Sequence, residues 1–204
     1  LDHTDLHKAN LWHARLWDAD ATNADFHQAD LTGAYFYCTK LAGAKLTDAI
    51  ITETWFTNAT SYGLTASQFY STASYKSKDL RGVNLSGNDL TGWNFTGQNL
   101  SYVDFFLATM TNADLTDATI QGTAFDQATD HGFTASQLYS TSSYKNRDLH
   151  EIILRENNLA SWNLVGQNLT NAYLDGTTLV NTDFTGADLR GAKGLTDSQT
   201  SPAI

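Results

Sequence analysis

Large apolar residues recur at every fifth position along most of the chain. Three runs, at residues 1–60, 78–129 and 147–193, keep this period without slippage, and Ala21 is its one weak member. On a helix, five residues advance the face by roughly 140°, and in a strand an odd spacing sends successive side chains to opposite faces. Neither element would bury such a stripe. The chain must therefore turn a corner every five residues, which predicts a solenoid with its apolar residues inside.

The residues around each apolar position form a recognisable motif. Ala often lies two residues before it and Asp or Asn one residue before it, as in Ala24-Asp25-Phe26. This motif resembles the A-[D/N]-L-x-x signature of the pentapeptide-repeat family. The resemblance implies an all-β fold, a right-handed, four-sided parallel β-helix with twenty residues per coil. We expect a single solenoid domain over residues 1–204, interrupted by two short inserted α-helices.

The interruptions are two copies of one block. GLTASQFYSTASY at 63–75 recurs as GFTASQLYSTSSY at 132–144, and the copies start 69 residues apart. Thr65 and Gln68 have the spacing of a capping box, in which the threonine caps a helix and the glutamine bonds back. The block therefore predicts short helices near 64–72 and 133–141. Because helices this short are marginal alone, we expect them to dock on the solenoid wall or an exposed end.

The duplication continues beyond the helical blocks. Trp93 and Trp162 match each other at an inward position where the family prefers a small residue. We expect each indole to pack against the helix of its own module, or the coil to widen locally. A third copy starts at Gly194 and stops, which predicts longer natural relatives with more modules. The final stretch TDSQTSPAI lacks the apolar residues of a dimerising helix.

Charge and composition exclude several function classes. Only 12 Lys and Arg face 22 Asp and Glu, and a net charge of −10 argues against direct nucleic-acid binding. The lone Cys38 makes neither an internal disulfide nor a multi-cysteine metal site. No apolar run approaches the ~20 residues of a membrane span. Abundant Ser, Thr and Asn with sparse Lys favour a secreted or extracellular setting.

Catalysis is not expected from this chain. There is no Ser/His/Asp spacing, phosphate-binding glycine loop or paired-histidine motif, and a narrow solenoid filled with Leu and Phe leaves no enclosed pocket. We therefore predict a protein that is not an enzyme and has no cofactor. His7 and His27, twenty residues apart, would stack on adjacent coils. They could share a metal with Asp5 or Asp25, but two exposed histidines in one column are the favoured interpretation.

One face stands out as a candidate binding site. With twenty residues per coil, Arg15, Tyr35 and Trp55 form one outward column, and Trp17, Tyr37 and Thr57 form a second column beside it. Aromatic residues and arginine are enriched at interfaces. We expect this face to bind a protein or a glycan, or to support end-to-end or side-by-side self-association. The alternative is that the ladders only stabilise neighbouring coils.

Two functions remain in competition. The first is a rigid scaffold or spacer that mediates interactions with an unidentified partner. The second follows from the resemblance, because some family members mimic duplex DNA and bind a type II topoisomerase such as gyrase. Spread along the predicted rod, the charge here averages one per ~4 Å, against one per ~1.7 Å in duplex DNA. The acidic column of Asp5 and Asp25 also ends in Lys45. The sequence therefore favours the scaffold.

Overall fold

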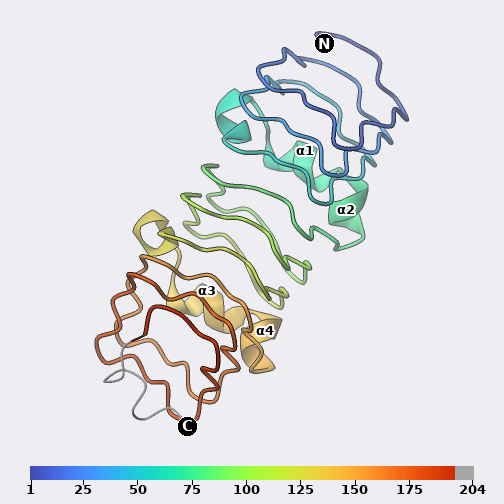
Figure 1. Ribbon diagram of the computed structural model, residues 1–204. Coiled ribbons are helices and arrows are strands. Elements are labelled where there is room, and N and C mark those ends of the chain that lie inside the picture. The colour runs from blue at the N-terminus through green and yellow to red at the C-terminus, as the bar shows by residue number, and fades with distance from the viewer. Residues whose placement is uncertain (196–204) are drawn as a thin grey trace.

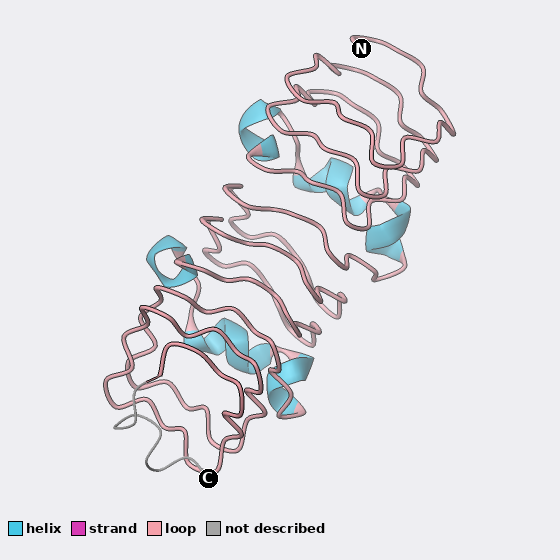
Figure 2. Cartoon of the chain, in the orientation of Figure 1, coloured by secondary structure: helices cyan, strands magenta, loops and turns pink. Residues whose placement is uncertain are grey.

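The computed structural model describes residues 1–195 as a stack of coils, with the first coil at one end and the last described coil at the other (Figure 1). Each five-residue unit contributes one parallel bridge, and bridged residues are twenty apart, as in Asp5 with Asp25 and Asp25 with Lys45. Each coil therefore contains four units. The bridges are single-residue contacts, so none of the described residues forms a strand (Figure 2). The β structure therefore consists of single parallel bridges between adjacent coils.

The corners explain the five-residue period. In nearly every unit the amide of the fourth residue donates to the carbonyl of the first, as from Thr4 N to Leu1 O at 2.9 Å. The third residue has a positive φ, such as 55° at Asn23 and 65° at Gly33. Glycine and asparagine adopt this conformation at low cost. One such turn per unit redirects the chain and leaves the next amides and carbonyls free to pair with adjacent coils.

The repeated apolar residues fill the interior, as the period predicts. Phe36 and Phe56 stack with ring centroids 5.2 Å apart, and Phe105 and Phe125 do so at 5.3 Å. The prediction that the central phenylalanines are buried is confirmed, because none has any exposed surface: Phe26, Phe36, Phe56, Phe95, Phe105 and Phe125. The core is one continuous column of rings and aliphatic side chains.

Each inserted block contains three short helices. The first comprises the 3-10 helix η1 (Ala59–Tyr62), α1 (Ala66–Tyr70) and α2 (Ala73–Lys76). The second comprises η2 (Ala128–His131), α3 (Ala135–Ser140) and α4 (Ser142–Lys145). Both capping boxes are present. Where one helix was expected per block there are two α-helices, because Thr72 and Thr141 adopt an extended conformation and cap the second one.

The helices lie within the stack, between consecutive coils (Figure 1). The side-chain amide of Gln68 in α1 donates to the carbonyls of Leu41 and Ala44 in the preceding coil, both at 2.8 Å. On the other side, the Tyr75 hydroxyl donates to the Asn94 carbonyl of the following coil at 2.8 Å. The expectation of docking on the wall or at an exposed end was therefore wrong. The helices replace ladder contacts on the sides that they occupy.

Both duplicated tryptophans pack against these helices. Trp93 lies 5.3 Å from Phe69 of α1, and Trp162 lies 6.4 Å from Tyr139 of α3, between ring centroids. This confirms the expected packing of each indole on the helix of its own module. The helix opens the space that an ordinary coil would not provide for an indole.

One side of the stack is never interrupted, and we call it the continuous side. Its bridges advance by twenty residues, and by 29 where a helical block intervenes, as from Trp55 to Asn84. The bridged column reads Arg15, Tyr35, Trp55, Asn84, Asp104, Ala124, Ile153, Tyr173 and Lys193. This side is therefore the one surface in residues 1–195 that keeps a regular ladder along its whole length.

Among residues 1–195, no helix is both long enough and apolar enough to cross a membrane. The third block copy from Gly194 onward and the stretch TDSQTSPAI extend over 196–204, which lie outside the described residues.

Candidate functional site

The structure brings the five predicted binding residues together on the continuous side. We call this group the aromatic patch: Arg15, Trp17, Tyr35, Tyr37 and Trp55. Tyr35 is the centre, with its ring 6.1 Å from Trp17 and 5.4 Å from Trp55. The guanidinium carbon of Arg15 lies 5.4 Å from the Trp17 ring centroid. About half of the surface of Trp17 and of Tyr37 remains exposed, at 52% and 49%.

A hollow of about 580 Å³ opens over the patch, and we call it the N-terminal groove. Its aromatic wall consists of Trp17, Tyr35, Tyr37 and Trp55. Its polar wall consists of Asp18, Thr57, Asn84, Ser86 and Asp104. The sequence predicted Thr57 in the second column, but the other four were missed as groove residues. The twenty-residue columns stopped at Trp55 and Thr57, where the first block begins. The 69-residue module could have extended them, because it comprises two coils of twenty residues and one of 29.

Asp104 is the most buried acid of the groove. Burial raises the pKa of its carboxyl above the ordinary value, although hydrogen bonds from Phe106 and Asn84 act in the opposite direction. The Phe106 amide donates to Oδ1 at 2.8 Å and the Asn84 amide to Oδ2 at 2.7 Å. Thr57 in turn donates to Asn84 at 2.9 Å. This network fixes the carboxylate at the edge of the groove.

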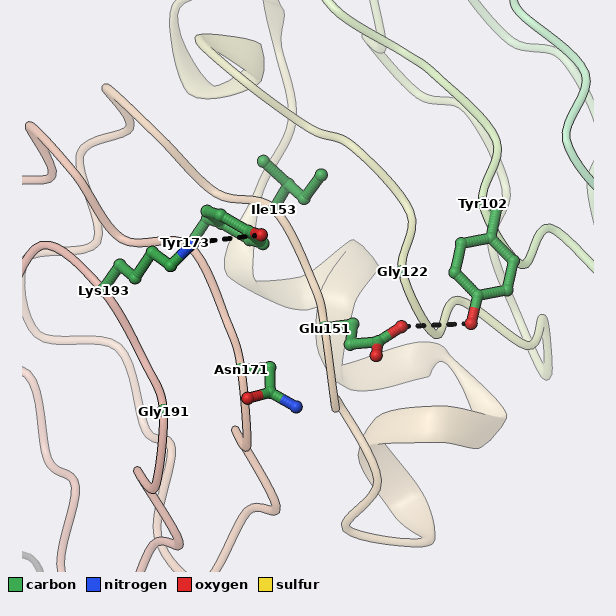
Figure 3. A pocket seen from close by; sticks show the side chains of 8 residues that line it. All are labelled: Tyr102, Gly122, Glu151, Ile153, Asn171, Tyr173, Gly191 and Lys193. Atoms are coloured by element: carbon green, nitrogen blue, oxygen red, sulfur yellow. Dashed lines mark hydrogen bonds between the residues drawn. The ribbon is translucent and has the colours of Figure 1, made fainter.

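A second hollow, the C-terminal groove, lies farther along the continuous side (Figure 3). It measures about 420 Å³ and is lined by Tyr102, Gly122, Glu151, Ile153, Asn171, Tyr173, Gly191 and Lys193. The Tyr102 hydroxyl donates to Glu151 at 3.0 Å, and Lys193 donates to the Tyr173 hydroxyl at 3.3 Å. Tyr102 and Glu151, and likewise Tyr173 and Lys193, are thus paired with each other by hydrogen bonds.

The histidine pair offers little as a metal site. The rings of His7 and His27 stack at 5.0 Å with an interplanar angle of 11°. His27 Nδ1 lies 2.9 Å from the Thr47 carbonyl oxygen, which occupies one of its two nitrogens. Residues 1–195 contain no group of three or more His, Cys, Asp or Glu side chains arranged to hold a metal ion.

Several solved structures resemble this chain. The pentapeptide repeat protein HetL of the cyanobacterium Nostoc, involved in heterocyst differentiation regulation, is 23% identical, with 94% of this chain and 75% of that chain covered and a TM-score of 0.30. QnrB1, a plasmid-mediated fluoroquinolone resistance protein, is 15% identical, with 98% and 92% covered and a TM-score of 0.36. A pentapeptide repeat protein from the thylakoid lumen of Arabidopsis thaliana is 16% identical, with 89% and 72% covered and a TM-score of 0.18.

Sequence comparison gives the family directly. No functionally curated protein matches the chain. The family described as pentapeptide repeats matches residues 1–36, 28–60, 79–105 and 158–193, with eight copies of the repeat. These ranges cover more than half of the chain and leave out both pairs of α-helices. The chain therefore belongs to the pentapeptide repeat family.

Proposed function

We propose that this protein is a rigid scaffold or spacer whose continuous side docks a partner protein at the aromatic patch. Pentapeptide repeat proteins are structural repeat scaffolds, and they are not enzymes. The proposal includes the right-handed, four-sided coil that the family resemblance implies, built as one solenoid domain. The twenty-residue bridge period supports that shape.

The observation that carries the proposal is the exposure of the patch. Tyr35 is largely covered by its neighbours, as a ladder residue that stabilises coils would be. Trp17 and Trp55 instead keep 52% and 44% of their surface in water, although they border a groove. Exposed aromatic rings beside a hollow are the typical anchors of protein interfaces. Stabilisation of the coils alone does not require this exposure.

Photo-cross-linking tests the proposal. A photoreactive residue replaces Thr57, which lines the groove, and the protein is irradiated in an extract of its source cells. We expect a specific cross-linked protein, and we expect the double variant Trp17→Ser/Trp55→Ser to lose it while remaining folded. Trp12→Ser is the matched control, because Trp12 is 62% exposed but does not line the groove. Retention of the adduct in the double variant, or equal loss in the control, would contradict the proposal.

DNA mimicry toward a type II topoisomerase remains the alternative, and the charges support it less well. Lysines neutralise several outward carboxylates through ion pairs, with Lys40 on Asp20 at 2.9 Å and Lys45 on Asp25 at 3.1 Å. A DNA mimic needs long uninterrupted rows of negative charge. A gyrase supercoiling assay separates the two functions, since inhibition at micromolar protein would favour mimicry over the scaffold.

A further inference from the structure

Two carboxylates border the exposed rings of the N-terminal groove. Asp18 and Asp104 line it together with the aromatic patch. Among residues 1–195, neither carboxylate has an ion-pair partner, whereas Asp20 and Asp25 are each paired with a lysine. Asp104 accepts hydrogen bonds only from neutral groups, the Phe106 amide and the Asn84 side chain. Both carboxylates of the groove are thus free of ion pairs within the described chain.

Some aromatic rings of the groove also have no cation of residues 1–195 over their faces. Arg15 lies over Trp17, but in the described part of the chain no cation lies over Tyr37 or Trp55. The face of an aromatic ring carries partial negative charge and attracts ammonium and guanidinium groups. The aromatic rings and the carboxylates of the groove therefore both favour a cationic ligand.

In the C-terminal groove, on the same side of the molecule, cations of the chain itself lie over an aromatic ring. Lys193 Nζ lies 4.3 Å from the Tyr173 ring centroid (Figure 3), and the Arg155 guanidinium carbon lies 4.7 Å from it. Tyr173 stands in the same bridged column as Trp55 and Asp104. In the C-terminal half of the column, cations of the chain itself therefore lie over the Tyr173 ring. In the N-terminal half, the described chain places no cation over Trp55 and no ion-pair partner beside Asp104.

We propose that the N-terminal groove binds an arginine side chain of the partner protein, with the guanidinium against Tyr37 and Trp55 and beside Asp104. This inference rests on the proposed docking function and names the chemistry of its ligand. Arginine fits better than lysine, because a planar guanidinium stacks on aromatic rings and also donates two parallel hydrogen bonds to a carboxylate. The guanidinium supplies the positively charged partner that the carboxylates of Asp18 and Asp104 lack within the described chain.

The test is calorimetric titration of the full chain with two acetylated, amidated peptides. One peptide carries three arginines spaced by Gly-Ser, and the other replaces each arginine by citrulline, which has nearly the same shape and no charge. We expect the arginine peptide to bind at least about tenfold more tightly than the citrulline peptide. Equal affinity of the two peptides would overturn the inference, because the groove would then recognise shape alone.

Variants locate the binding and separate it from general attraction to an acidic protein. We expect Asp104→Asn and Trp55→Ser each to weaken the arginine peptide about tenfold. Asp183→Asn is the control, because it removes the same charge at an equivalent repeat position outside the groove, where Oδ1 accepts from Thr185 N at 2.9 Å. If Asp183→Asn weakens binding as much as Asp104→Asn, diffuse charge explains the result and the inference fails.

The experiments distinguish failure of the arginine inference from failure of the docking function. If cross-linking at Thr57 depends on Trp17 and Trp55 but the arginine peptide does not bind, docking stands and the arginine inference falls. If instead the wild-type chain self-associates and the patch variants do not, a second copy occupies the groove. That result would overturn the inference unless the arginine peptide dissociates the dimer.

Discussion

Phe105 shows at the scale of one residue how the period specifies the interior. It lies at a central position, has no exposed surface and stacks on Phe125 of the next coil, whereas its neighbour Phe106 remains 39% exposed. Two adjacent phenylalanines thus have opposite environments because only one of them falls on the five-residue frame. The frame, and not hydrophobicity alone, decides which side chain is buried.

The two residues give a direct test of the frame. We expect Phe105→Ala to lower the free energy of unfolding by about 3–5 kcal/mol, because it leaves a cavity in a close-packed core. Phe106→Ala should change it by less than about 1 kcal/mol, as surface substitutions usually do. Urea unfolding of both variants provides the measurement. Equal losses would mean that the frame is misassigned.

Acidic residues at equivalent repeat positions should titrate differently. Hydrogen bonds from Thr91 and Thr116 lower the pKa of Asp89 and Asp114, whereas burial raises the pKa of Asp104. Asp89 and Asp114 therefore contribute stability at pH values above their unfolded-state pKa of 3.8. This contribution is lost as the pH falls through their lower folded pKa values. Asp104 has the opposite sign, with a contribution present below 3.8 and lost as the pH rises through its folded pKa.

NMR titration of the side-chain carboxyl carbons would measure these values. We expect Asp104 to titrate above 3.8 and Asp89 and Asp114 to titrate below it. Titration of all three carboxyls below 3.8 would mean that Asp104 is as well solvated as the others.

At the scale of elements, the capping threonines define the helical blocks. Thr65 accepts from the Gln68 amide at 3.3 Å, while the Thr65 amide donates to the Gln68 side chain at 2.8 Å. Thr134 and Gln137 repeat both bonds at the same distances. The two caps are therefore equivalent parts of a duplicated module.

Removal of either cap should destabilise the protein measurably. We expect Thr65→Ala and Thr134→Ala each to cost about 0.5–2 kcal/mol, because a helix amide loses its acceptor. Thr65→Ser, which keeps the hydroxyl, is the control and should cost less. The unfolding midpoint in urea is the measurement, and an unchanged midpoint in both alanine variants would show that the caps are dispensable.

The capping box was predictable from sequence because its signal is local, but the position of the helices was not. Gln68 has two roles, since its carbonyl oxygen closes the box while its amide nitrogen bonds to Leu41 and Ala44. The second role joins residues at least 24 positions apart and has no motif. It fixes the helix between coils, where the backbone ladder is missing. The split at Thr72 was also missed, because a Thr inside a short helical pattern resembles any other polar residue.

At the scale of the whole molecule, the continuous side unites the two grooves. Its column is aromatic at Tyr35 and Trp55, where the Trp55 ring stays exposed, and it is cationic near Lys193, which lies over the Tyr173 ring. Twenty-residue spacing predicted the patch, because Arg15, Tyr35 and Trp55 precede the first block. It could not include Asp104, since the block changes the spacing to 29 residues. Extending the column past the block needs the 69-residue module, and the structure shows that Asp18 and Asp104 line one groove with the patch.

We propose that ligands bind at the N-terminal groove of the continuous side. The chain has five tryptophans, so fluorine-19 NMR of protein labelled with 5-fluorotryptophan tests this claim directly. Trp17 and Trp55 lie at the groove, Trp12 is exposed outside it, and Trp93 and Trp162 are buried. On titration with the arginine peptide, we predict that the signals of Trp17 and Trp55 move together while the other three stay in place. Movement of Trp12 alone, or equal movement of Trp12 and Trp55, would contradict the claim.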